Sequence, residues 1–202
     1  MDFIFQILIL IMSVVIHEVS HGYAASFLGD QTAKYEGRLT LNPFNHLDPV
    51  GSFLVPLLSY SLGGFIIGWA RPVPYNPYNL RPGRWSEAMV ALAGPASNIA
   101  IALIFGLFLR FSEEALMGAA FIQIVAVIVF INIILAVFNL MPVPPLDGSK
   151  VLFALFPENF VGVRQFYERW GIFLLIFFVF FLWQFLLPVV VFIFRLITGV
   201  LL

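Results

Sequence analysis

The chain contains no cysteine and few charged residues. Its 202 residues include ten Lys or Arg and eleven Asp or Glu, together 10%, whereas 61% are hydrophobic. Without cysteine, disulfides, thiolate metal sites and a cysteine nucleophile are excluded, so metal ligands must be His, Asp or Glu. No run of Lys or Arg indicates a nucleic acid partner. The low charge and a mean hydropathy of +1.01 predict an integral membrane protein whose main surroundings are the lipid bilayer.

The first apolar stretch also lacks the features of a removable signal peptide. It has neither a cationic start nor a cleavage pattern of small residues. We therefore expect the segment from Phe3 to about Leu28 to be retained. It is long enough for one crossing, because roughly 20 helical residues span the hydrocarbon core.

Later apolar segments complete the prediction of an all-α, multi-pass membrane protein. One uncharged span runs from Met89 to Leu109 and another from Ala115 to Leu146. The second helix is expected to end near Asn139 to Met141, because prolines follow at positions 142, 144 and 145. The last strongly apolar run, Trp170 to Phe194, is expected to split at Pro188, and the path beyond that proline stays open.

The segment of about residues 33–70 is predicted to be a small β-hairpin followed by a re-entrant segment. Ala33 to Leu41 alternates polar and apolar residues with the period of a strand. Pro49 to Ala70 has no charge, but its Gly, Ser and Pro residues suit a continuous helix poorly. If this segment dips in and returns, the cationic loops share one face, as the positive-inside rule requires. We therefore predict an N-terminus outside and cationic loops in the cytoplasm, with a full crossing by residues 49–70 as the alternative.

The first apolar stretch carries the sequence His-Glu-Val-Ser-His, from His17 to His21. On a helix, positions i and i+4 share one face, so both imidazoles can point at one metal ion while Glu18 holds the attacking water. Haem binding, proton relay or bonding to neighbouring backbone are the alternatives. Ionisable side chains at membrane depth are costly, which favours a functional site. At about 1.5 Å per residue, His17 lies roughly 20 Å from Phe3, toward the cytoplasmic face.

Asp147 is the best candidate for a third metal ligand. Catalytic zinc needs three protein ligands and an open position for water. Asp147 follows a proline-rich break, which frees backbone groups at membrane depth and so implies a lined cavity. The alternative is that Asp147 caps a short helix beginning at Gly148. The sequence thus predicts one zinc ion per chain, held by His17, His21 and Asp147.

Three motifs in this order resemble the site-2 protease family of intramembrane zinc proteases. The motifs are His17-Glu18-x-x-His21, Gly94-Pro95-x-x-Asn98, and Asn139-x-x-Pro142 leading to Leu146-Asp147-Gly148. The resemblance implies a three-helix catalytic core within about residues 3–155, with additional C-terminal transmembrane helices at about 164–202. It also implies His17, His21 and Asp147 as zinc ligands and Glu18 as the catalytic base. Asn98 and Asn139 match asparagines expected to hold substrate backbone or polarise its carbonyl.

By this resemblance, residues 1–202 form a single integral membrane protease domain, a compact member without a PDZ or nucleotide-binding regulatory domain. The implied activity is hydrolysis of peptide bonds within or near transmembrane segments of membrane-anchored proteins or peptides, in the cell membrane. His46 is a further candidate, as an auxiliary or gating residue at the zinc site. Its alternative role is that of a polar residue where a loop enters the membrane.

Two other functions fit parts of the pattern. A divalent-metal transporter would also place His and Glu within helices, but it needs polar ligands along several helices. The spans at 89–109 and 170–194 offer only Ser97, Asn98 and Gln184. A catalytically inactive membrane scaffold is the second alternative, and the complete set of Glu18 and three ligands argues against it.

Overall fold

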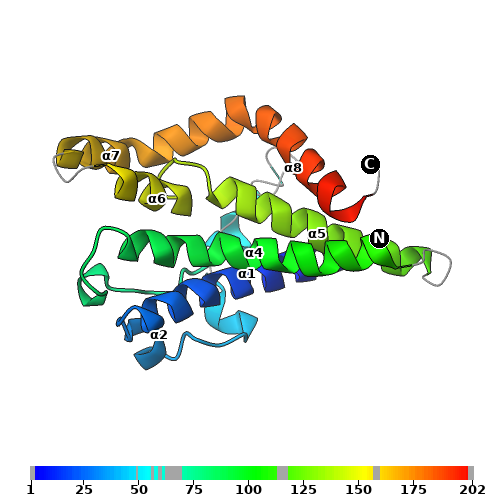
Figure 1. Ribbon diagram of the computed structural model, residues 1–202, viewed down its shortest axis with the longest axis horizontal. Coiled ribbons are helices and arrows are strands. Elements are labelled where there is room, and N and C mark those ends of the chain that lie inside the picture. Colours follow the sequence, from blue (N-terminus) through cyan, green and yellow to red (C-terminus); the bar gives the residue numbers. More distant parts are fainter. Residues whose placement is uncertain are drawn as a thin grey trace.

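The computed structural model describes residues 3–48, 50–55, 57–58, 61, 70–112, 118–156 and 160–199. Within these ranges every regular element is a helix (Figure 1), which confirms the predicted all-α class. The elements, with η marking short 3-10 or π segments, are α1 (Phe3–Phe27), α2 (Thr32–Tyr35), η1 (Pro43–His46), η2 (Val50–Leu54), η3 (Pro77–Asn79), α4 (Ser86–Phe111), α5 (Ala119–Asn139), α6 (Asp147–Leu155), α7 (Val161–Phe177), η6 (Phe178–Leu182) and α8 (Trp183–Thr198).

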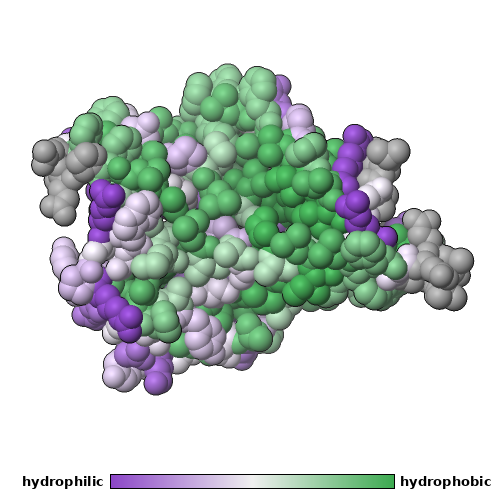
Figure 2. Space-filling model, viewed as in Figure 1, coloured by the Kyte–Doolittle hydropathy of each residue, from purple (hydrophilic) through white to green (hydrophobic). Residues whose placement is uncertain are grey.

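Four helical segments are long and apolar enough to cross a membrane. They are Ile4–Phe27, Ser86–Phe111, Ala119–Asn139 and Gly162–Leu182. Figure 2 shows a broad apolar band on the surface, with polar residues gathered toward the two ends. Exposed apolar surface of this extent suits contact with lipid rather than water. The chain is therefore a multi-pass integral membrane protein.

The long helices pack around α4, which contacts α1, α5, α6 and α8. One core cluster joins Ala102 of α4, Val129 and Ile133 of α5, and Phe194 of α8, all buried. Small residues permit this close packing, because a Cβ on Gly106 of α4 would collide with the side chain of Ile197.

The turn after α5 was predicted correctly. The helix ends at Asn139, and α6 begins at Asp147 and packs against α4. The turn is compact, since a Cβ on Gly148 would meet backbone atoms of Leu140 and Met141. Substitution of Gly148 would therefore push against main chain rather than a flexible side chain. The turn thus brings Asp147 back beside the bundle.

The predicted strand at Ala33 to Leu41 is wrong. Thr32–Tyr35 is the short helix α2, and the described residues contain no strand. Asp30 holds the first residue of this helix, because its Oδ1 accepts hydrogen bonds from the Thr32 backbone N–H (3.2 Å) and hydroxyl (2.6 Å) across the N-cap residue Gln31. Gly37, at φ +64°, then ends the turn in the left-handed region that favours glycine. These local hydrogen bonds outweigh the period-two pattern.

The re-entrant prediction falls largely outside the described residues. Of Pro49 to Ala70, the structure describes the π segment η2, the neighbouring Val55, residues 57–58 and 61, and Ala70 itself. The choice between a dip and a full crossing therefore stays a prediction.

The last apolar run changes direction earlier than predicted. The expected break at Pro188 is absent, since this proline lies inside α8. The interruption is instead the π segment η6, Phe178–Leu182, between α7 and α8. The ribbon bends in this region (Figure 1). A π turn widens the helix and commonly accompanies such bends.

Asp30, just after the end of α1, forms hydrogen bonds to the loop that contains Asn76 and Asn79. Its buried carboxylate accepts hydrogen bonds from the Asn76 backbone N–H at 2.8 Å and the Asn79 side chain at 3.0 Å, besides those from Thr32. Burial alone would raise the pKa of Asp30, but these hydrogen bonds outweigh it and lower the pKa below its usual value. The loop is thereby held beside the C-terminal end of α1.

Candidate metal centre

Three candidate ligand atoms meet at one point between α1 and α6. The Nε2 atoms of His17 and His21 are 3.0 Å apart, and Asp147 Oδ2 lies 3.2 Å from each. In the described part of the chain, these residues form the single group of three or more His, Cys, Asp or Glu whose ligand atoms lie close enough together to hold one metal ion. The one-turn spacing on α1 brings the two rings together, and the turn after α5 supplies the carboxylate.

Asp147 does not act as the cap of α6. Leu146 occupies the N-cap position, and Asp147 is already the first helical residue. Its carboxylate is directed at the two imidazoles instead. Burial alone would raise the pKa of Asp147, but hydrogen bonds with His17 and His21 lower it to about 2. The carboxylate is thus ionised, as metal ligation requires.

The donor set fits a zinc ion. Donors about 2.0–2.2 Å from a tetrahedral ion lie roughly 3.3–3.6 Å from one another. The three atoms here are 3.0–3.2 Å apart, close to that separation. Two imidazoles and one carboxylate are typical of catalytic zinc, which keeps its fourth position open.

The ring nitrogens that point away from the metal position, Nδ1 of each imidazole, form hydrogen bonds to α4. His17 Nδ1 donates to Asn98 Oδ1 at 2.6 Å, and His21 Nδ1 donates to the Val90 carbonyl at 2.7 Å. When a zinc ion is bound, a proton kept on Nδ1 would leave the Nε2 lone pair of each ring free to coordinate the ion. Such outer partners set both the tautomer and the orientation of a ligand ring.

Asn98 belongs to a buried polar network rather than to the open part of the site. It is fully buried, and its Nδ2 donates to Asn132 Oδ1 at 2.8 Å and the Ser13 carbonyl at 3.4 Å. Asn132 in turn donates to the Ser13 hydroxyl at 3.0 Å. Sequence reasoning missed Ser13 and Asn132, although a buried amide in the middle of the apolar α5 was an available signal.

Gly94 provides the space for the two histidines. A Cβ at this position would overlap His21 Nε2 and approach His17 Nε2 to 2.6 Å. The glycine of the Gly94-Pro95 pair thus allows α4 to lie directly against both imidazoles. Its role is steric and was not apparent from the sequence.

A cavity of about 180 Å³ opens beside the candidate ligands. Its lining comprises His17, Glu18, His21, Pro72, Val73, Tyr75, Asn139, Pro145, Leu146, Asp147 and Lys150. Asn139 is therefore at the cavity, where its Nδ2 donates to the Leu135 carbonyl at 2.9 Å. Asn98 is not part of the lining.

Glu18 faces an extended segment that crosses the cavity. Its Oε2 accepts a hydrogen bond from the Val73 backbone N–H at 2.9 Å. Buried Arg38 holds the same segment by donating to the carbonyls of Arg71 at 3.0 Å and Pro72 at 3.3 Å. The sequence offered no pattern that pairs Arg38 with this segment. The carboxylate of Glu18 is thus positioned from both α1 and the segment opposite.

His46 lies apart from the candidate ligands. It is buried, and its Nε2 donates to the Thr40 carbonyl at 2.8 Å. Its backbone carbonyl accepts the Arg71 N–H at 2.8 Å, which ties η1 to the extended segment. It belongs neither to the metal group nor to the cavity lining.

Replacement of Asn98 by Ala is expected to weaken zinc binding by roughly 10–100-fold, the usual effect of losing an outer partner of a ligand histidine. His17 would lose the acceptor that fixes its tautomer. Zinc content after dialysis against a graded chelator series measures the change. Asn45→Ala changes an exposed amide outside the cavity lining and is the matched control. Equal zinc retention by the two variants would contradict the role assigned to Asn98.

Comparison with known proteins agrees with this site. The profile described as Peptidase family M50 matches residues 110–182. "Putative zinc metalloprotease YwhC" of Bacillus subtilis is 41% identical over 166 residues, which cover 79% of this chain and 71% of the relative. "Putative zinc metalloprotease Rip2" of Mycolicibacterium smegmatis is 36% identical over 143 residues, covering 70% of this chain and 53% of the relative. No solved structure matches the chain.

A multi-pass helical protein with two histidines, an aspartate and a neighbouring glutamate around one point has the features of a membrane zinc metalloprotease. The chain belongs to peptidase family M50, the site-2 protease family. It is accordingly a zinc-dependent metalloendopeptidase, as the resemblance of its motifs implied.

Proposed function

We propose that this protein hydrolyses peptide bonds within or near the transmembrane segments of membrane-anchored proteins or peptides. The observation that carries the proposal is that Glu18 shares one cavity with His17, His21 and Asp147, and that α1, which carries Glu18 and both histidines, is long and apolar enough to cross a membrane. Such a site is accessible to peptide bonds that a water-soluble protease does not reach.

In this proposal one zinc ion per chain is held by His17, His21 and Asp147. A bound zinc ion would lower the pKa of a water molecule toward 7 and polarise the scissile carbonyl. Glu18 lines the same cavity and accepts the proton of the attacking water, then returns it to the leaving amine. No covalent intermediate with the protein is needed.

The substrate must unwind before its carbonyl reaches the site, because a transmembrane helix keeps its peptide bonds in internal hydrogen bonds. The extended backbone of Pro72, Val73 and Tyr75 lines the cavity and is suited to lie beside an unwound chain. Asn139, also in the lining, is placed to bond substrate backbone. Asn98 acts through His17, and His46 supports the loop that carries Arg71.

A membrane-anchored reporter tests the proposal. The purified chain, reconstituted in vesicles with zinc, is expected to cut the reporter within or next to its transmembrane segment, as mapped by mass spectrometry of the products. A chelator should stop the reaction and added zinc should restore it. Transport of zinc into the vesicles without cleavage would favour the transporter alternative, and zinc binding with neither activity would favour the inactive scaffold.

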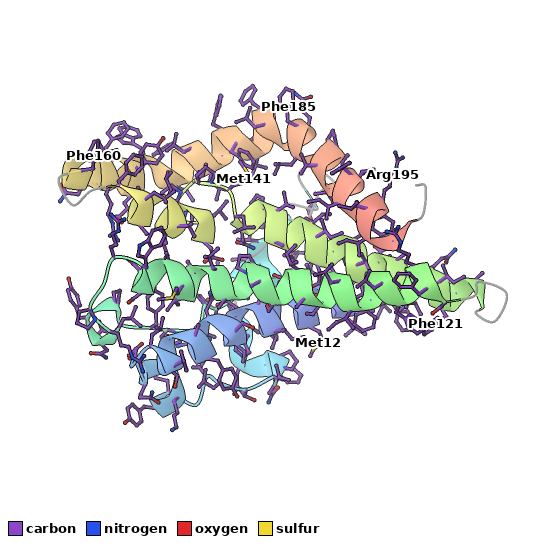
Figure 3. All side chains as sticks on the ribbon, viewed as in Figure 1. Met12, Phe121, Met141, Phe160, Phe185 and Arg195 are labelled. Carbon is purple, nitrogen blue, oxygen red and sulfur yellow. The ribbon has the colours of Figure 1, made fainter. Side chains whose placement is uncertain are left out.

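We further propose that the chain lies in the cell membrane with its N-terminus outside and the metal site toward the cytoplasm. Three helix ends lie at one end of the bundle (Figure 1): the C-terminal end of α1 and the N-terminal ends of α4 and α7. The loop that carries Arg81 and Arg84 lies at the same end. Phe160 and Arg195 mark opposite ends of the α7–α8 arm (Figure 3). Arg81 and Arg84 therefore lie at the proposed cytoplasmic end, in accord with the positive-inside rule.

Single cysteines test this orientation, because the chain has none of its own. Cysteine at Asn76, which is exposed, should react with a membrane-impermeant maleimide only from the cytoplasmic side. Cysteine at Ser112, beyond the C-terminal end of α4, should react only from outside. The reverse pattern would contradict the orientation, and labelling of both from one side would contradict the crossing by α4.

A further inference from the structure

A second and larger cavity lies at the end of the bundle where α4 and α7 begin. Its volume is about 530 Å³, compared with about 180 Å³ for the cavity at the metal centre. It is open on one side and bordered by the loop before α4, the first turn of α4, α6 and the start of α7. Lys150 lines both cavities. Neither the motifs nor the proposed proteolysis assigns a role to the larger one.

Four cationic side chains line this cavity. Arg81, Arg84, Lys150 and Arg164 line it, and Glu87 is the single carboxylate in its lining. Arg164 bonds Glu87 at 3.3 Å and Glu168 at 2.8 Å. Within the described ranges, the other three cations have no carboxylate within ion-pair distance.

The three cations without a carboxylate pack instead on aromatic rings. Arg81 lies 5.7 Å from the ring centre of Phe27 and Arg84 lies 5.4 Å from that of Trp85. Lys150 Nζ is 4.8 Å from the ring centre of Tyr75. Such contacts hold the side chains in place without neutralising them. The cavity therefore carries a fixed excess of positive charge.

Most other residues of the lining are apolar. They include Phe153 and Phe156 from α6 and its end, with Phe160 and Val163 from the start of α7, and the Arg164 guanidinium lies 5.4 Å from the ring centre of Phe153. The rings of Phe156 and Phe160 stack at 5.4 Å. Figure 3 shows Phe160 at the extreme end of the α7–α8 arm. A cavity lined by both cations and apolar side chains suits a ligand that is itself amphipathic.

The helix N-termini at this cavity also affect its potential. Both α4 and α7 start at this cavity, and their N-cap residues, Trp85 and Phe160, make no side-chain cap. Glu87 in the first turn of α4 partly offsets the dipole of that helix, whereas the first turn of α7 has no acidic residue. The positive end of α7 therefore adds to the charge of the four cations.

We propose that this cavity binds the headgroup of an anionic phospholipid, with the phosphate at Arg81, Arg84 and Lys150 and the start of the acyl chains against Phe156 and Phe160. The cavity lies where two candidate spans begin, the depth at which headgroups reside. The polar residues at that end of the bundle border the broad apolar band (Figure 2). Clusters of Lys and Arg beside membrane helices typically bind anionic lipids. In the proposed orientation, cytoplasmic flanks of substrates are themselves rich in Lys and Arg, which the cations of this cavity would repel.

Lipid titration of the full chain tests the proposal. The purified protein in detergent is titrated with phosphatidylglycerol or phosphatidylcholine, and retained lipid is counted by native mass spectrometry. Phosphatidylglycerol should be retained at least fivefold better. The double variant Arg81→Gln/Arg84→Gln should retain it roughly ten- to thirtyfold less well, because each cation near an anionic lipid contributes about fivefold in affinity.

The double variant Lys34→Gln/Arg169→Gln is the matched control, since it removes the same charge from exposed positions outside the cavity lining. It should change phosphatidylglycerol retention less than twofold. Added salt should weaken retention by the unmodified chain, a measurement that needs no variant to fold. Equal retention of the two lipids, salt-independent retention, or equal loss in both double variants would each overturn the proposal. Full displacement of the lipid by an equimolar Glu-rich peptide would identify a peptide site instead.

Discussion

Glu18→Gln is expected to reduce cleavage of a membrane-anchored reporter by roughly 10²–10⁴-fold, the usual contribution of general acid–base catalysis. Gln has the same size as Glu and can still accept the Val73 N–H through its side-chain oxygen. It has no carboxylate to take the proton of the attacking water. The cavity should therefore keep its shape and lose its base.

Zinc content separates this result from a folding defect. Glu18 is not among the three candidate ligand residues, so Glu18→Gln should bind one zinc ion per chain like the unmodified protein. Glu36→Gln makes the same chemical change at an exposed position in the loop after α2 and should leave the cleavage rate within about twofold, as surface changes usually do. Undiminished cleavage by Glu18→Gln would exclude Glu18 as the base.

The Asp147→Ala variant is expected to bind almost no zinc and therefore to have almost no cleavage activity. The carboxylate is one of three donors within 3.2 Å of one another, and two imidazoles alone leave zinc short of the three protein ligands that catalytic sites use. The loss should exceed the roughly 10–100-fold effect of removing an outer partner such as Asn98. Equilibrium dialysis with zinc measures both variants on one scale.

His46→Gln is the control for Asp147→Ala. It removes the third histidine of the chain, which is buried beside Thr40 and outside the metal group. Zinc affinity should be unchanged. The substitution alters the bond to the Thr40 carbonyl and should lower the stability of the loop, so the free energy of unfolding is measured alongside. Zinc loss in His46→Gln would restore His46 as an auxiliary ligand. Full retention of zinc by Asp147→Ala would remove Asp147 from the ligand set.

The extended segment at Pro72 to Tyr75 shows why sequence patterns located the metal ligands better than their surroundings. His17 and His21 are one helical turn apart, so local geometry alone places them together. Val73 reaches Glu18 from 55 residues away, and its contribution is a backbone N–H that any residue except proline would supply. No side-chain pattern marks such a position. The predicted strand at Ala33 to Leu41 failed for a related reason, because hydrogen bonds to Asp30 and the backbone conformation of Gly37 decide that segment.

By itself, the sequence determined the all-α membrane class, the end of α5 at Asn139 and the metal-binding motif on α1, because length, hydropathy, proline and one-turn spacing act locally. Only the tertiary structure decided that Asp147 faces the imidazoles instead of capping α6, that Asn98 and Val90 fix the two rings, and that Gly94 makes room for them. These roles depend on how α1, α4 and α6 pack, which brings together residues up to 130 positions apart. The cationic cavity likewise exists only because a loop, two helix starts and α6 meet at one end of the bundle.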